Sequence, residues 1–106
     1  MMRFKVLHIL ARADMGGGPR QVQYLLESIN DKVDCFVCCP EDEPFVSIFR
    51  KLLGDDKISI IPHREVSIGA LITLLKFIKE NNISIIHCHG KGASVYGKLI
   101  KIFGGK

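Results

Sequence analysis

Two short segments of the 106-residue chain carry residues that could bind an anion or move a proton. The first is Asp14-Met15-Gly16-Gly17-Gly18-Pro19-Arg20. Its glycines lack Cβ atoms, and its proline suits the first turn of a helix. The free amide N–H groups of such a helix start carry a partial positive charge, which favours phosphate or carboxylate groups. We therefore predict that Gly16, Gly17 and Gly18 bind an anion.

Two questions about this glycine segment stay open at the level of sequence. Arg20 either donates a charge-assisted hydrogen bond to a phosphate oxygen or faces solvent. The glycines could also serve only as a tight connection between a strand and a helix. The spacing matches neither G-x-G-x-x-G nor G-x-x-x-x-G-K-[ST], so it gives no specific support for a dinucleotide site or a P-loop.

The second segment runs from His87 to Ser94, with the sequence His-Cys-His-Gly-Lys-Gly-Ala-Ser. In an extended chain, His87 and His89 point to the same side, where they could donate hydrogen bonds or act on a hydroxyl group. We favour His89, because it lies where the strand gives way to a loop; in the alternative, His87 is a partly buried structural residue. Lys91, Ser94 and the nearby amides form a second candidate anion site at a helix start.

The two glycines of the second segment, Gly90 and Gly92, keep this loop free of bulk. That property suits either a ligand or close packing of the backbone. We expect no metal ion at the histidines, because zinc usually takes three or four protein ligands and no acidic or cysteine partner is obviously placed to complete a site. His8 is expected to be structural, since it lies inside an apolar strand.

The four cysteines lie in apolar runs, where a free thiol behaves as a small hydrophobic group. Cys35 and Cys38 have the C-x-x-C spacing of redox motifs, but on a strand an offset of three places the two thiols on opposite faces. We expect reduced cysteines and a cytoplasmic setting.

The elements that must position these segments are alternating strands and helices. Strands are predicted at residues 4–10, 33–39, 58–61 and 83–88 from their apolar, β-branched runs. Helices are predicted after the glycine segment, after Pro44, from Ile68 to Glu80 and from about Gly92, with Ser67 as an N-cap and Gly54 as a helix end. The residues expected to face inward from these helices are Val22, Leu25, Leu26, Ile29, Phe45, Ile48, Phe49, Leu52, Leu71, Ile72, Leu75, Ile78, Tyr96, Leu99, Ile100 and Phe103.

This alternation predicts an α/β fold: a Rossmann-like three-layer sandwich with a four-stranded parallel sheet of order 3-2-1-4 and helices on both faces. The first and fourth strands would then be neighbours at the point where the chain reverses direction. Ligands of such sheets bind beyond the carboxyl ends of the strands at this reversal. The fold would therefore bring the glycine segment beside His87 and His89.

Length and composition fit a single domain spanning residues 1–106. The net charge of +4 is spread over scattered lysines, so nucleic acid is not an expected partner, whereas anionic nucleotides and membrane surfaces fit a mild positive charge. No segment approaches the roughly 20 apolar residues of a membrane-spanning helix.

The two segments together with Val6-Leu7-His8-Ile9-Leu10 resemble the N-terminal domain of family 4 glycosyltransferases, which are retaining enzymes of the GT-B fold. The resemblance covers nearly the whole chain. It implies transfer of a sugar from a nucleotide diphosphate sugar to a glycan or a lipid-linked acceptor, with no cofactor and no metal ion. By position, Gly16, Gly17, Gly18 and Arg20 would face the donor diphosphate.

The acceptor side of the site would be formed, on the same resemblance, by residues of the second segment. The family's C-terminal nucleotide-sugar domain, with its E-x7-E motif, has no counterpart in this sequence, so we expect the chain to be inactive alone. Peripheral association with the inner membrane face and self-association through the exposed sheet edge are further expectations. A stand-alone module that binds a phosphate ligand or a partner subunit is the alternative. The acceptor-side residues would be His87, His89, Gly90, Lys91 and Ser94.

Overall fold

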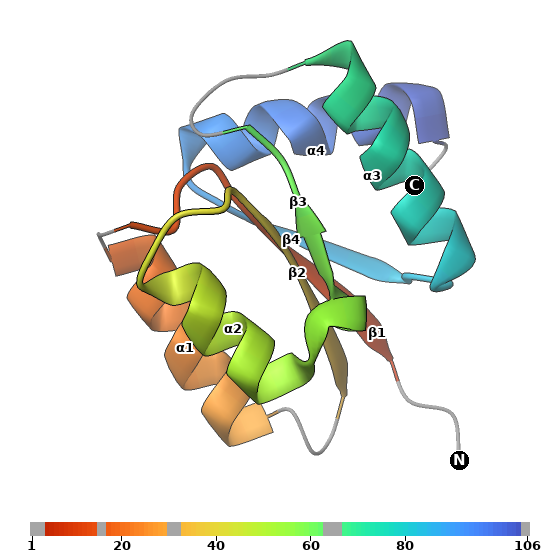
Figure 1. Cartoon of the computed structure of the whole chain (residues 1–106). Coiled ribbons are helices and arrows are strands. Elements are labelled where there is room, and N and C mark those ends of the chain that lie inside the picture. The colour runs from red at the N-terminus through yellow and green to blue at the C-terminus, as the bar shows by residue number, and fades with distance from the viewer. Residues whose placement is uncertain (1–3, 15–16, 30–32, 63–66, 105–106) are drawn as a thin grey trace.

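The computed structural model describes residues 4–14, 17–29, 33–62 and 67–104, and it shows strands and helices in alternation (Figure 1). Within these residues the strands form one parallel sheet of order β3-β2-β1-β4, so the predicted α/β fold and strand order are confirmed. The elements are β1 (Lys5–Leu10), α1 (Gly17–Ile29), β2 (Asp34–Cys39), α2 (Phe45–Leu53), the short 3-10 helix η1 (Asp55–Lys57), β3 (Ile58–Ile60), α3 (Ile68–Glu80), β4 (Ile85–His89) and α4 (Lys91–Gly104).

Local signals in the sequence account for several helix ends. The Ser67 side chain accepts a hydrogen bond of 3.0 Å from the Ala70 amide, which caps the start of α3. Gly54 ends α2 with a φ of 95°, a left-handed conformation that glycine adopts without a steric penalty. Both ends were predicted.

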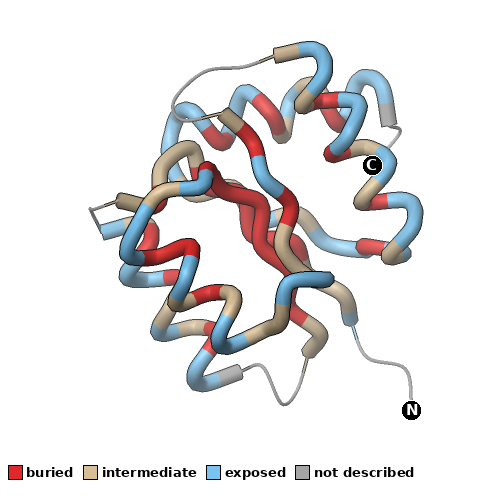
Figure 2. The backbone as a smooth tube through the Cα atoms, viewed as in Figure 1, coloured by how far each residue is buried: buried red, intermediate tan, exposed pale blue. Residues whose placement is uncertain are grey.

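The helices cover the sheet from both sides. α1 and α2 lie on one face, and α3 and α4 lie on the other (Figure 1). Burial is concentrated along the strands in the middle of these layers, while the outer helix surfaces are exposed (Figure 2).

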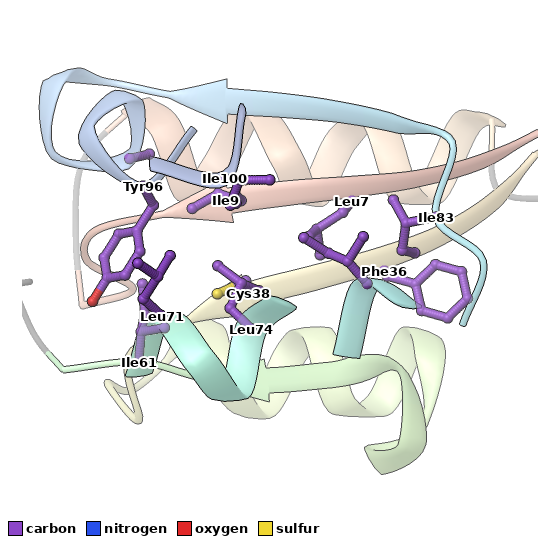
Figure 3. Close-up of a cluster of buried hydrophobic side chains, with 12 residues drawn as sticks. Leu7, Ile9, Phe36, Cys38, Ile61, Leu71, Leu74, Ile83, Tyr96 and Ile100 are labelled. Carbon is purple, nitrogen blue, oxygen red and sulfur yellow. The ribbon is translucent and has the colours of Figure 1, made fainter. Parts of the chain in front are cut away.

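Two hydrophobic clusters hold the layers together, one on each face of the sheet. Alternate residues of β1 divide between them, because successive side chains of a strand point to opposite faces. The α3/α4 cluster is shown in Figure 3 and includes Leu7, Ile9, Phe36, Cys38, Ile61, Leu71, Leu74, Ile78, Ile83, Ala93, Tyr96 and Ile100. The α1/α2 cluster contains Leu10, Ala13, Val22, Leu26, Cys35, Val37, Cys39, Phe45, Val46 and Phe49.

Three of the predicted inward-facing residues whose side chains the structure describes are exposed instead; Ile29 lies outside that set. Ile72 is 60% exposed and Phe103 is 67% exposed, while Leu52 is 36% exposed. In α2 and α3 the buried stripe is shifted toward one edge of the predicted stripe, so that Val46 and Leu74 are buried although neither was predicted to face inward. Phe103 lies in the last turn of α4, beyond the part of the helix that packs on the sheet.

The strand β4 differs from its predicted range in a way that matters for the site. It begins at Ile85, two residues later than predicted, and it includes His89. Ile83 is buried, and its amide donates a hydrogen bond to the Ile78 carbonyl at the end of α3, so this residue belongs to the connection. His89 pairs with Leu10 in the sheet, so it is the last strand residue and not part of a loop.

Candidate functional site

The carboxyl ends of β1 and β4 lie side by side, as the predicted strand order requires. Leu10, the last residue of β1, is the sheet partner of His89, the last residue of β4. From these two ends the chain turns into α1 and α4, which cover opposite faces of the sheet. This is the reversal point at which ligands bind in open α/β sheets.

A cavity of about 730 Å³ occupies this reversal point. Its volume lies within the range of roughly 300 to 1,000 Å³ that is typical of ligand pockets. Both segments that the sequence singled out contribute to its wall. The residues that line it are Leu10, Ala11, Arg12, Gly17, Gly18, Pro19, Gln21, His89, Gly90, Lys91 and Gly92.

Gly17 and Gly18 of the first segment are the first two residues of α1. The helix begins at Gly17, so Pro19 lies in its first turn, as predicted. A Cβ atom built on Gly18 would lie 3.5 Å from Leu10 Cδ2 and 3.9 Å from the Cβ of His89, which shows how close the two segments are. A Cβ atom on Gly17 would meet nothing within 4 Å. The start of α1 is therefore open at Gly17 and packed at Gly18.

The loop between β1 and α1 is held by polar contacts that the sequence did not reveal. Arg12 donates hydrogen bonds of 2.7 and 3.1 Å to the two carboxylate oxygens of Asp14, and the bond to Asp14 raises the pKa of the guanidinium. The Ala13 amide donates to Asp42, 3.2 Å away, and its carbonyl accepts from the Phe45 amide at 3.1 Å. These contacts tie the loop to the start of α2 and position Arg12 at the cavity wall.

The connection between β4 and α4 depends on two glycines. Gly90 has a φ of 97°, which disfavours residues with a Cβ atom. A Cβ atom on Gly92 would lie only 2.6 Å from the Cβ of Ala11, so the start of α4 packs directly against the β1 end. Close backbone packing, one of the two interpretations of the sequence, therefore applies to Gly92.

Ser94 does not face the cavity as the second segment had suggested. Its amide and hydroxyl both donate to the Gly90 carbonyl, at 3.1 and 2.9 Å. It lines a separate, smaller cavity of about 380 Å³, together with Cys88 and Lys98 among other residues. The Ser94 amide is therefore already paired with a carbonyl of its own segment. The amides of the preceding residues lie in the first turn of α4, where they have no partner inside the helix.

The predicted donor-side residues divide into two groups. Gly17 and Gly18 line the cavity, and Gly16 lies outside the described residues. Arg20 is exposed and is not among the lining residues; its guanidinium carbon lies 5.6 Å from the ring centroid of Phe45, over α2. A role of Arg20 in anion binding stays a prediction.

Three histidines gather beside the cavity, two from β4 and one from β1. His8 and His87 are partners in the sheet register, and His89 follows two residues later, so all three side chains point to the same face. His8 Nδ1 lies 3.1 Å from His89 Nε2. The ring centroids of His87 and His89 are 4.0 Å apart. His8 is buried, His89 is half-buried and lines the cavity, and His87 is exposed.

This arrangement lowers the basicity of two of the histidines. Burial is the main cause that lowers the pKa of His8 to about 4, and repulsion by His89 and His87 adds to it. Burial, followed by repulsion from His87, lowers the pKa of His89 to about 4 as well. Both rings are therefore neutral at pH 7, so each keeps a nitrogen lone pair that can accept a proton or bind a cation.

The cysteines are not part of this site. Cys35 and Cys38 belong to the clusters on opposite faces of the sheet, as predicted. Burial raises the pKa of Cys39 to about 12 and that of Cys38 well above its usual value; burial also raises the pKa of Cys88. Their thiols are therefore protonated at neutral pH, which makes a redox role unfavourable.

Arg12, Gln21 and His8 are the neighbours of the site that sequence reasoning missed. Arg12 follows β1 closely, and residues after a parallel strand reach the ligand edge of the sheet, so its position was a usable signal. His8 could have been found by pairing β1 with β4 residue by residue. Gln21 lies one turn into α1, where nothing in the sequence distinguishes it.

None of the described helices is both long and apolar enough to cross a membrane. Comparison of the chain with protein-family models, with curated proteins and with solved structures found no match.

Proposed function

We propose that this chain forms the acceptor-side part of a retaining glycosyltransferase of the GT-B type, which moves a sugar from a nucleotide diphosphate sugar to a glycan or lipid-linked acceptor. The observation that carries the proposal is the cavity at the carboxyl ends of β1 and β4, which joins the open start of α1 to the His89-Gly90-Lys91 connection. Each of the two segments that carry the resemblance to this family contributes part of the cavity wall: Gly17, Gly18 and Pro19 from the first, and His89, Gly90, Lys91 and Gly92 from the second.

The cavity offers groups suited to a diphosphate. The first turns of α1 and α4 both begin at its wall, and amide N–H groups in a first turn have no partner inside their own helix. Lys91 adds a positive charge at the same place. When a glycosidic bond to a diphosphate breaks, negative charge accumulates on the leaving oxygens, and donors held in place stabilise it.

The same cavity offers one group suited to a hydroxyl acceptor. His89 is neutral at pH 7 and half-buried at the wall, so its imidazole can accept a hydrogen bond from a sugar hydroxyl. In this proposal a second domain holds the nucleotide, and the present chain supplies half of the site.

Calorimetric titration of the chain with uridine diphosphate, guanosine diphosphate and pyrophosphate tests this division. Half of a site predicts weak, millimolar binding that depends on the diphosphate and not on the base. The variant Lys91→Gln should weaken binding by about two- to fivefold, as expected for one exposed charge pair. Lys98→Gln removes an equal charge from the other side of α4 and should change binding little. Equal effects of the two variants would contradict a diphosphate site at this cavity.

Activity measurements test the transferase class itself. We expect no release of nucleotide from uridine or guanosine diphosphate sugars by the chain alone, with or without glycan acceptors. The coding sequence past Lys106 is expected to continue into a second α/β domain with an E-x7-E motif. Turnover by the chain alone would contradict the half-site proposal.

A stand-alone phosphate-binding module is the second candidate, because the cavity of about 730 Å³ already has the volume of a ligand pocket. It predicts micromolar affinity for a phosphate ligand in the same titration. It also predicts a stop codon directly after Lys106. Those two results together would replace the transferase proposal.

A further inference from the structure

We infer that His8, His87 and His89 form a binding site for a divalent transition-metal ion of the zinc class, on the sheet face where β1 and β4 meet. This inference departs from the expectation of a metal-free site. It does not rest on the proposed glycosyl transfer, because it depends only on the geometry of the three imidazoles.

The sheet register gathers the three rings on rigid elements. His8 sits directly across from His87 in the parallel pair, and His89 is displaced along the same strand by two residues. One potential ligand nitrogen from each ring lies within 4.8 Å of the other two. A site built on paired strands holds its ligands with little conformational freedom, which lowers the entropic cost of binding an ion.

The distances are close to those of a tetrahedral metal site. Zinc–imidazole bonds of about 2.0 to 2.1 Å place two ligand nitrogens about 3.3 Å apart. His8 Nδ1 and His89 Nε2 already lie 3.1 Å apart. One nitrogen from each of the three rings lies within 4.8 Å of the others, so the remaining separations exceed the ligand spacing by at most about 1.5 Å.

The two ring nitrogens of His8 have different surroundings, because Nδ1 faces His89 Nε2 whereas Nε2 is buried away from it. His8 is 2% exposed, and its Nε2 atom is buried. Among the described residues, no hydrogen-bond partner is found for this nitrogen. Leaving such an atom unpaired costs about 1 to 3 kcal/mol. In the proposed site His8 binds the ion through Nδ1, and the ring proton is then held on Nε2, which fixes the tautomer of the ring.

The chemistry of the surroundings selects the ion. Three imidazole ligands favour zinc, copper, nickel or cobalt over magnesium or calcium, which prefer oxygen ligands. The thiol of Cys88 packs on the opposite face of the sheet and keeps its proton, so it does not compete. Three ligands leave a fourth position for water or a ligand oxygen, and His89 places the ion beside the large cavity.

Thermal unfolding of the untagged chain gives the first test. An ion that binds the folded state alone raises the midpoint temperature, and the rise grows with the logarithm of one plus the ratio of its concentration to its dissociation constant. Zinc ions should raise the midpoint and a chelator should reverse the change, while magnesium ions at the same concentration should have no effect. Equal midpoints with and without zinc would overturn the inference.

Cobalt absorption with matched variants locates the site. Tetrahedral cobalt bound by imidazoles gives visible bands without a thiolate charge-transfer band, so strong thiolate absorption would overturn the assignment. His87→Gln changes an exposed ring and should fold normally, yet it should weaken cobalt binding by about 100-fold or more, because even the loss of outer-sphere partners costs 10- to 100-fold. His63→Gln, which removes the remaining histidine of the sequence, should leave the affinity unchanged. Equal losses in both variants would overturn the proposed ligand set.

Discussion

The two faces of β4 have opposite characters within one five-residue strand. Ile86 and Cys88 pack against the cluster under α3 and α4. On the other face, Ile85 is 45% exposed, His87 is exposed and His89 is half-buried at the cavity. One face of the strand is therefore structural, and the other presents polar groups to solvent.

This difference separates the residues of β4 that stabilise the fold from those that could bind a ligand or an ion. The α3/α4 cluster consists of hydrophobic residues, including thiols with raised pKa values, so this face contributes to folding. The open face holds imidazoles whose partners are each other. The predictions below compare substitutions in the packed part of the molecule with substitutions at its open face, and so test whether the two faces have these different roles.

The largest expected difference concerns two isoleucines. Ile100 of α4 is fully buried in the α3/α4 cluster, and its change to alanine should lower the free energy of unfolding by about 2 to 5 kcal/mol, because it leaves a cavity in the core. Ile85→Ala removes the same atoms from the open face and should cost less than about 1 kcal/mol. Urea unfolding of both variants measures this difference, and similar losses would show that the faces are equally packed.

A second prediction concerns acid. The pKa of His8 is about 4 in the folded chain against 6.5 when unfolded, so the unfolded state binds more protons between these values. Stability should be full above about pH 6.5 and fall by about 3 kcal/mol as the pH drops to 4. His89 faces His8 and acts in the same direction. Urea unfolding at several pH values, with a chelator present, should show this slope, and His8→Gln should reduce it. An unchanged slope in that variant would contradict burial of His8 as its cause.

A third, smaller effect separates two glycines at the helix starts. Gly92→Ala would place a Cβ atom 2.6 Å from that of Ala11 and should cost about 1 to 3 kcal/mol through overpacking. Gly17→Ala meets nothing within 4 Å and should be neutral or stabilise the helix by up to about 1 kcal/mol. Thermal unfolding compares the pair, and an equal effect at both positions would contradict the tight contact between α4 and β1.

Much of this arrangement followed from the sequence because it depends on local patterns. Strand order, the Ser67 cap and the Gly54 end come from alternation, hydrogen-bonding side chains and glycine geometry. The meeting of the glycine segment with His89 followed from the strand order in turn.

The remaining features could not be predicted from short stretches of the sequence, because they depend on contacts between distant elements. Periodicity places an apolar stripe on α3 but does not say which edge of it touches the sheet, and Ile72 was assigned to the wrong edge. The contact of His8 with His89 joins residues 81 positions apart, and it depends on the register between two strands. That register is set by the packing of the whole sheet.

The central claim is that ligands bind at the open carboxyl edge of β1 and β4. Two-dimensional NMR of the backbone amides during a titration with pyrophosphate tests it most directly. We predict that the shifted amides cluster in residues 10–12, 17–18 and 89–92, while those around the smaller cavity at Gly97 and Lys98 stay in place. Shifts centred on the smaller cavity, or none at the glycines of α1, would contradict the claim.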